Sequence, residues 1–167
     1  MKKFEKKNEK LNLKKGNNDD WGIMIRSVAE IFSLIENYEN KEINFEFEFS
    51  YIEIYNEQIK DLLDESLNNP EIKKQPPTLR EDPEEGVCLC GVSKHKPKTS
   101  EEVFEMLRIG NENRSTSATA ANHVSSRSHA ILLLYMKRTK KTIDGGKLIN
   151  EIKYSTLSMI DLAGSER

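Results

Sequence analysis

Two polar segments of this chain carry the residues best suited to chemistry. The first, residues 122–129 (NHVSSRSH), places the hydroxyls of Ser125 and Ser126 next to the guanidinium of Arg127. Hydroxyl oxygens can bind Mg²⁺ or a phosphate, and arginine offers a fixed fork of donors to the same anion. A polar loop whose serines only cap neighbouring structure is the alternative.

The second segment, residues 158–167 (SMIDLAGSER), leads from an apolar strand into a loop, with Asp161 where the strand ends. Ligands of open α/β sheets bind at the carboxyl ends of strands, and a carboxylate there can hold hydrated Mg²⁺. Gly164 has no side chain to shield its N–H from a phosphate oxygen. These residues indicate a nucleotide triphosphatase site, with a turn-capping aspartate as the alternative. A serine hydrolase fits poorly because the chain has no G-x-S-x-G elbow.

Regular structure must bring these two segments together. Apolar residues spaced along one face predict a helix over residues 24–35. Alternation over residues 43–51, followed by a switch of phase at Ile52, predicts a strand over residues 43–55 that runs from a sheet margin into a covered interior. Residues 58–63 indicate a short helical turn, residues 64–77 a loop, and two short strands are expected around a turn at residues 81–86.

A second helix is predicted to start at a capping box, residues 99–102 (TSEE), and to end at Gly110. A long polar loop follows over residues 111–128. The remaining elements are a buried strand over residues 130–136, a hairpin-type turn at residues 144–146 and a last buried strand over residues 154–160. This order indicates an α/β fold with a mixed sheet.

Length, charge and cysteine content limit the class of protein. The 167 residues and net charge of −2 suit one domain and argue against a dedicated nucleic-acid binder. Residues 1–20 are predicted to be a disordered leader rich in Lys and Asn, and residues 21–167 the domain. No run of about 20 apolar residues predicts a membrane span, and the leader has no apolar core typical of a secretory signal. Cys88 and Cys90 are too few and too close for a disulfide scaffold, which favours a reducing compartment.

Both polar segments resemble motifs of the kinesin motor domain family. Residues 122–129 match the kinesin switch I motif N-x-x-S-S-R-S-H, and residues 161–166 (DLAGSE) match switch II. Residues 51–63 (YIEIYNEQIKDLL), 79–82 (LRED) and 110–114 (GNENR) also fit, in the same order along the chain. The resemblance implies a P-loop-NTPase-like motor core, three-layered with a central mixed β-sheet, and incomplete in this chain.

The resemblance also implies a role for individual residues. In kinesins the two switches sense the γ-phosphate of ATP, with Mg²⁺ as the cofactor. Arg127 and Glu166 would form an ion pair that positions the attacking water, with Ser125 as a further catalytic residue. Arg114 would brace the same loops, and His129 would hydrogen-bond a neighbour rather than act as a base. The implied nucleotide-binding residues are Asn122, Ser125, Ser126, Asp161 and Gly164, of which Ser126 and Asp161 would hold Mg²⁺, Asp161 through water.

A cationic loop is the implied contact with microtubules. Positive charge suits an acidic tubulin surface, although ordinary solvated lysines are the alternative. Association with microtubules in the cytoplasm follows from this role. Residues 94–102 and 131–138 further resemble the kinesin-eight subfamily. The candidate contact residues are Lys94, His95, Lys96 and Lys98.

Two features depart from the kinesin pattern. None of the eight glycines opens a Walker A loop, G-x-x-x-x-G-K-[ST], and the sequence stops at Arg167, just after switch II. We therefore expect this chain alone to bind ATP very weakly, to hydrolyse it negligibly and to aggregate through exposed strands. The sequence leaves two alternatives open. One is a non-enzymatic kinesin-like module that binds tubulin or another motor chain, and the other is a split motor whose P-loop lies on a separate polypeptide.

Overall fold

The computed structural model describes residues 22–38, 42–67, 69, 71, 74–83, 86–115, 127–145 and 147–165. The predicted leader, residues 1–20, lies outside these ranges, and its division from the domain stays a prediction. The elements, in chain order, are α2 (Ile23–Glu36), β1 (Ile43–Tyr55), β2 (Gln58–Asp61), the 3₁₀ helix η2 (Glu65–Leu67), β3 (Thr78–Asp82), β4 (Gly86–Cys90), α3 (Ser100–Ser115), β5 (His129–Asp144) and β6 (Lys147–Asp161).

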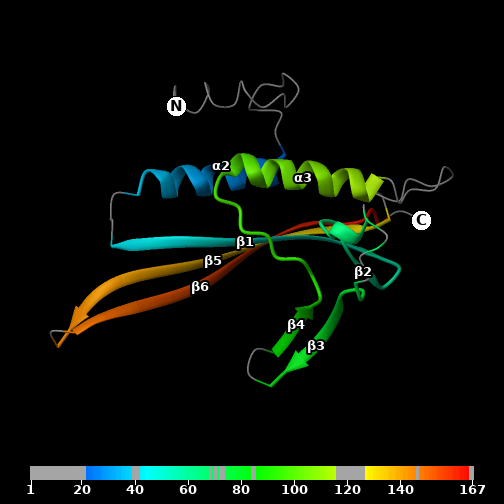
Figure 1. Ribbon diagram of the computed structural model, residues 1–167. Coiled ribbons are helices and arrows are strands. Elements are labelled where there is room, and N and C mark those ends of the chain that lie inside the picture. The colour runs from blue at the N-terminus through cyan, green and yellow to red at the C-terminus, as the bar shows by residue number, and fades with distance from the viewer. Residues whose placement is uncertain are drawn as a thin grey trace, which may run out of the picture.

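A four-stranded sheet carries both described helices on one face. Its strand order is β2-β1-β5-β6, and each pair of neighbours is antiparallel. Figure 1 shows α2 and α3 above the sheet, with the β3–β4 hairpin projecting on the other side. The predicted α/β class is confirmed. The described strands form the antiparallel part of the expected mixed sheet, and the described helices form one layer of the expected three-layered core.

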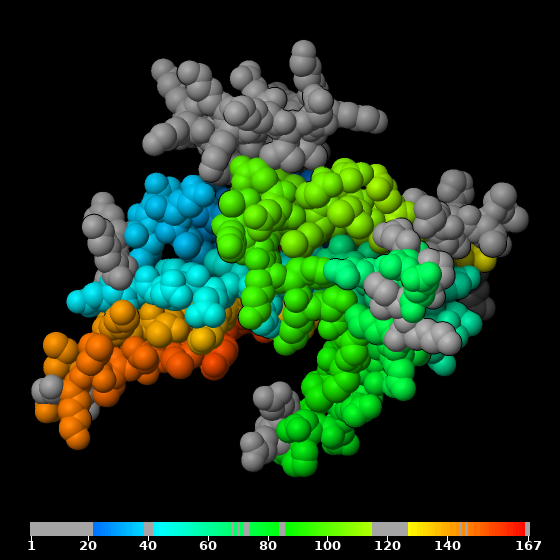
Figure 2. Space-filling view, in the orientation of Figure 1, coloured from blue at the N-terminus to red at the C-terminus, as the bar shows by residue number. Residues whose placement is uncertain are grey.

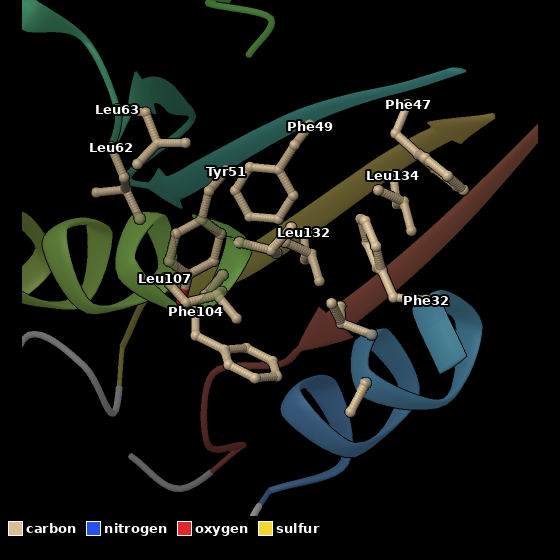
Figure 3. Packing of buried hydrophobic residues seen from close by; sticks show 14 residues of the cluster. Phe32, Phe47, Phe49, Tyr51, Leu62, Leu63, Phe104, Leu107, Leu132 and Leu134 are labelled. Atoms are coloured by element: carbon tan, nitrogen blue, oxygen red, sulfur yellow. The ribbon is translucent and has the colours of Figure 1, made fainter. Parts of the chain in front are cut away.

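The hydrophobic core lies between this sheet and the two helices. Side chains alternate along β1, so Phe47, Phe49 and Tyr51 point to the helices while the residues between them point away. The predicted helical stripe of α2 is confirmed by Phe32, whose ring lies 5.0 Å from that of Phe47. The buried cluster consists of Val28, Ala29, Phe32, Phe47, Phe49, Tyr51, Leu62, Leu63, Val103, Phe104, Leu107, Ala130, Leu132 and Leu134 (Figure 3).

The helical turn predicted over residues 58–63 is wrong, because β1 folds back on itself into β2. Tyr55 pairs with Gln58, so only Asn56 and Glu57 form the loop. Their φ angles are 48° and 62°, the left-handed values that a type I′ hairpin turn requires at both positions. Asn tolerates this conformation, but Glu rarely adopts it. The pair Asn-Glu therefore does not carry the Asn-Gly signal from which such a turn is usually predicted.

The prediction that Gly110 ends the second helix is also wrong. α3 continues to Ser115, and Gly110 lies within it. A Cβ atom at this position would lie 2.3 Å from Cδ1 of Tyr51, so glycine permits a close approach of α3 to β1. The predicted cap at the other end is confirmed, since the Glu102 N–H donates to Oγ1 of Thr99 at 3.3 Å.

The last strand is longer and more exposed than predicted. β6 begins at Lys147, and β5 is its one neighbour among the described strands. Its apolar side chains are largely exposed, Tyr154 to 76%. An apolar run indicates a strand, but burial depends on what packs against it, and Met159 is the one described β6 side chain that packs against the buried cluster. Figure 2 shows the β5–β6 and β3–β4 hairpins as two arms that project away from the helical layer.

The base of the β3–β4 arm is tied to the sheet through a buried carboxylate. Asp61 Oδ2 accepts from the Ser93 N–H at 2.6 Å and from the Lys74 ammonium at 3.3 Å. Oγ of Ser50, on β1, donates to the Ser93 carbonyl at 2.7 Å. These bonds hold the segment that follows β4 against the sheet. The two strands predicted around residues 81–86 and the turn predicted after Asp144 are both confirmed.

Candidate functional site

The strands β1, β5 and β6 and the helix α3 meet at one end of the sheet. The register pairs Ala130, near the start of β5, with Asp161, the last residue of β6. α3 ends at the same place, as Figure 1 shows. The two polar segments singled out in the sequence enter and leave the sheet here, at Ser128 and Asp161. The fold therefore brings together residues that the chain separates by more than thirty positions.

The side chain of Arg114, on the last turn of α3, connects these segments. Its Nη1 lies 3.2 Å from Oδ2 of Asp161, and its Nη2 donates to the carbonyl oxygen of Ser128 at 3.0 Å. Its Nε lies 3.5 Å from Oε1 of Glu53, on β1. Only 11% of the side chain is exposed. The predicted bracing role of Arg114 agrees with these contacts, and the rigid fork of a guanidinium suits three acceptors in different directions.

Glu53 and Ser128 complete the buried side of this cluster. Oγ of Ser128 donates to Oε1 of Glu53 at 2.6 Å, and both residues are buried. A buried carboxylate needs a cation and hydrogen-bond donors, which Arg114 and Ser128 supply. No role in the site was predicted for either residue, although Ser128 lies within the predicted switch I segment. The signal available was Glu53 itself, a charged residue between Ile52 and Ile54 in the covered part of a strand.

The Asp161 side chain contacts the same polar cluster and is also open to solvent. Its carboxylate contacts Arg114, yet 60% of the side chain is exposed at the end of β6. Hard carboxylate oxygens open to solvent suit hydrated Mg²⁺, so the residue fits the predicted water-mediated contact. Ser126, the other predicted Mg²⁺ ligand, lies outside the described residues. No group of three or more metal-ligating side chains occurs within the described ranges.

His129 contacts the chain beyond Asp161. The Ala163 N–H donates to Nδ1 of the imidazole at 3.1 Å. The predicted role of His129, a hydrogen bond to a neighbour, is confirmed. In this bond Nδ1 is the acceptor, which leaves Nε2 as the donor atom of the ring.

Polar contacts also hold the end of α3 against β1 and β2. The Tyr51 hydroxyl donates to Oδ1 of Asn111 at 2.8 Å, beside the close approach at Gly110. The Asn113 amide donates to the Leu62 carbonyl at 2.8 Å. Burial raises the pKa of Tyr51, and the nearby Arg114 guanidinium lowers it in part. The last turns of α3, which carry Arg114, are therefore held by hydrogen bonds to Tyr51 and to the Leu62 carbonyl.

The remaining predicted nucleotide and catalytic residues are only partly described. Arg127 is exposed in the turn before β5, and Gly164 is exposed just after β6. The other predicted residues, Asn122, Ser125, Ser126 and Glu166, lie outside the described residues. The ion pair between Arg127 and Glu166 therefore stays a prediction.

The four predicted microtubule-contact residues are distributed over two places. Lys94 and Lys96 both lie near Glu48, at 3.4 and 3.7 Å, on the sheet face away from the helices. With Tyr135, they line a cavity of about 230 Å³. His95 pairs through its backbone with Phe49, while Lys98 precedes α3.

Neither described helix is long and apolar enough to cross a membrane.

Comparison with known proteins identifies the family. The family model described as the kinesin motor domain matches residues 11–167. This chain belongs to the kinesin motor domain family.

Its curated kinesin relatives agree with this assignment. The chain is 42% identical over 146 residues to the kinesin-like protein KIP3 of Saccharomyces cerevisiae, covering 87% of this chain and 17% of that protein. It is 41% identical to human KIF18B, covering 91% and 16%, and 38% identical to Arabidopsis thaliana KIN-8B, covering 91% and 17%. The predicted resemblance to the kinesin-eight subfamily is supported. The chain spans less than a fifth of the length of these relatives.

Solved kinesin structures share the fold. One is a KIF14 dimer in a two-heads-bound state with AMP-PNP in complex with a microtubule; the TM-score is 0.73, the identity 33%, and the match covers 91% of this chain and 41% of that chain. Another, a fast kinesin, gives a TM-score of 0.71 at 32% identity, covering 87% and 37%. The predicted motor-core fold is confirmed as part of a kinesin motor domain. The comparisons support the predicted fragment of a kinesin motor domain.

Proposed function

We propose that this chain is the nucleotide-sensing part of an ATP-driven, microtubule-based kinesin motor. The observation that carries the proposal is the Arg114 guanidinium, which contacts Ser128 at the end of switch I and Asp161 at the start of switch II. One cation shared by two segments makes the position of each depend on the other. A phosphate bound at one switch would thereby alter the other.

Asp161 and Gly164 supply the phosphate side of this proposal. The exposed carboxylate of Asp161 would hold Mg²⁺ through water, and the Gly164 N–H would donate to the γ-phosphate of ATP. Bound Mg²⁺ supplies positive charge that offsets the charge of the phosphates. The further nucleotide contacts proposed are Asn122, Ser125 and Ser126.

The proposed catalytic residues are Arg127, Glu166 and Ser125. The ion pair between Arg127 and Glu166 would close the two switches and orient the water that attacks the γ-phosphate. The exposed position of Arg127 beside the start of β5 leaves its guanidinium accessible to such a partner. Ordering both loops at once would couple phosphate binding to the shape of the site.

Microtubule binding is proposed for the cationic segment after β4. The side chains of Lys94 and Lys96 are well exposed, and Lys98 is exposed as well. Glu48 offsets part of the charge of the first two, so Lys98 contributes charge that no described carboxylate balances through an ion pair. His95 would shape this segment through its backbone bonds to Phe49. Such a motor would be located on microtubules of the cytoplasm.

The test uses the protein purified through a tag on its own gene. We expect ATP hydrolysis that microtubules stimulate, and an Asp161→Asn variant with activity lowered about tenfold or more, since the charge for Mg²⁺ is lost. Glu151→Gln, a carboxylate removed from the same strand but far from the site, is the control and should keep full activity. Microtubule pelleting that does not respond to ATP, without hydrolysis, would overturn the proposal and favour the non-enzymatic module.

A further inference from the structure

The bond between His129 and Ala163 reaches past the end of the sheet. The β5–β6 ladder ends with the pair Ala130 and Asp161, so backbone pairing no longer holds the chain beyond Asp161. Two residues later the Ala163 N–H donates to Nδ1 of His129 at 3.1 Å. A side chain thus continues the attachment of this segment to β5 where the strand cannot.

His129 is well placed to fix its partner. It is the first residue of β5, which pairs with β1 on one side and with β6 on the other. Residues 129–144 all pair with one or both neighbouring strands, and His129 itself pairs with Ile54 of β1, so the backbone that carries the imidazole has little freedom. The ring is partly buried, which further restricts its rotation.

We propose that His129 is a positioning residue that sets the direction of the Gly164 N–H. His129 holds the peptide group that joins Leu162 to Ala163. The next peptide group, which joins Ala163 to Gly164, contains the Gly164 nitrogen. Only the two backbone dihedrals of Ala163 separate these groups, so holding the first restricts the second. The inference rests on the proposed function, in which the Gly164 N–H contacts the γ-phosphate.

This role is separate from that of Arg114. Arg114 contacts the carboxylate of Asp161, whereas His129 contacts the backbone two residues further on. One bond holds the predicted Mg²⁺ side of the segment and the other holds its predicted phosphate side. Loss of the imidazole acceptor should therefore disturb Gly164 while the contact between Arg114 and Asp161 remains.

Two substitutions separate the acceptor from the bulk of the side chain. The Asn Oδ1 atom occupies a position close to that of His Nδ1, so His129→Asn retains an acceptor for Ala163. The Gln Oε1 atom stands one bond further out, near the position of Nε2, so His129→Gln misplaces it. Both variants are neutral, polar and lack a ring, which makes them a matched pair.

The hydrogen bond is tested by NMR on the ¹⁵N-labelled tagged protein at about pH 8, where a free imidazole is neutral. We expect the ¹⁵N shift of an unprotonated Nδ1 in the wild type, and slow exchange of the Ala163 amide. His129→Asn should stay within about threefold of the wild-type exchange rate, and His129→Gln should exchange about tenfold faster or more. The Phe49 amide, bonded to the His95 carbonyl at 2.8 Å, is the internal reference that separates local change from global unfolding. A protonated Nδ1, or equal Ala163 exchange in all three proteins relative to Phe49, would overturn the inference.

The consequence for catalysis is tested in the tagged protein. A displaced phosphate donor should lower kcat for ATP about tenfold in His129→Gln with little change in KM. His129→Asn should keep most of the wild-type kcat. Unchanged kcat in His129→Gln, with the Ala163 exchange altered as expected, would overturn the positioning role while the proposed motor function stands. Absence of hydrolysis in the wild type would instead overturn the proposed function, and the NMR result would still decide the hydrogen bond.

Discussion

The hydroxyl of Ser128 donates to the carboxylate of Glu53 at 2.6 Å, and both side chains are buried beneath the end of α3. Arg114 lies 3.5 Å from the same carboxylate and reaches on to Asp161. The buried carboxylate of Glu53 thus holds the Arg114 guanidinium in place. The exposed carboxylate of Asp161 connects the same guanidinium to the predicted nucleotide site.

Removing the charge of Glu53 should destabilise the protein strongly. Glu53→Gln keeps the shape of the side chain but leaves a buried guanidinium without its nearest buried carboxylate, a loss of about 3 kcal/mol in the free energy of unfolding. Urea unfolding followed by circular dichroism measures it. Glu46→Gln, which removes an exposed partner of Lys137, should cost less than about 1 kcal/mol. Equal effects of the two substitutions would contradict the assignment.

Replacing Gly110 by alanine should destabilise the fold even though alanine favours helices. The gain in helix propensity is about 1 kcal/mol, but the new methyl group would stand 2.3 Å from the Tyr51 ring. We expect a net loss of about 1–3 kcal/mol, measured by thermal unfolding. In a Tyr51→Val background, which itself loses core contacts, adding Gly110→Ala should cost less than it does in the wild type, since the smaller side chain leaves room. Stabilisation by Gly110→Ala alone would show that α3 does not approach β1 this closely.

Arg114→Lys should impair coupling of the switches while the charge is kept. An ammonium group lacks the planar fork that donates to the Ser128 carbonyl and contacts Asp161 at the same time. We expect microtubule-stimulated ATP hydrolysis to fall about tenfold in the tagged protein. Arg108→Lys changes an exposed arginine on the same helix, paired with Glu105 and Glu112, and should leave the rate unchanged. The prediction fails if both variants behave alike.

Stability should fall at alkaline pH because of Tyr51. Burial raises the pKa of this phenol above that of the unfolded chain, so the folded state keeps its proton while the unfolded state loses it. The stabilisation is complete below about pH 10 and is lost as the pH rises beyond that value, by up to about 1.4 kcal/mol per pH unit. Tyr51→Phe should flatten this slope between about pH 9.5 and 11, whereas Tyr154→Phe, at an exposed position, should not. Denaturant midpoints measured across this range provide the test, and parallel slopes in all three proteins would argue against it.

Microtubule affinity should depend on the cationic segment. Lys96→Ala and Lys98→Ala together remove two charges, and we expect binding several-fold weaker in co-pelleting at low salt, with the difference shrinking as salt rises. Lys153→Ala removes a charge that is paired with Glu151 on β6 and serves as the control. Equal loss in the control would mean that overall charge, and not this surface, determines binding.

The sequence by itself determined the local elements and the candidate segments. Three local features were predicted from residues within a few positions of one another: the apolar stripe of α2, the alternation of β1 and the cap at Thr99. A short stretch of sequence contains all the residues that each of them needs. The switch motifs were also evident at this level, since each is a contiguous run of residues. The turn at Asn56 and Glu57 escaped because Glu carries no left-handed preference for the sequence to reveal.

Tertiary structure decided which of these residues act together. Gly110 resembles a helix stop in sequence, and only the approach of Tyr51 shows why the helix continues past it. The exposure of β6 depended in the same way on what packs against this strand, which is little apart from the contacts of Met159. Glu53 and Ser128 are 75 positions apart, and Arg114 and Asp161 are 47 apart. No local pattern encodes such pairs, because their contact exists only once the strands have paired and α3 has packed across them.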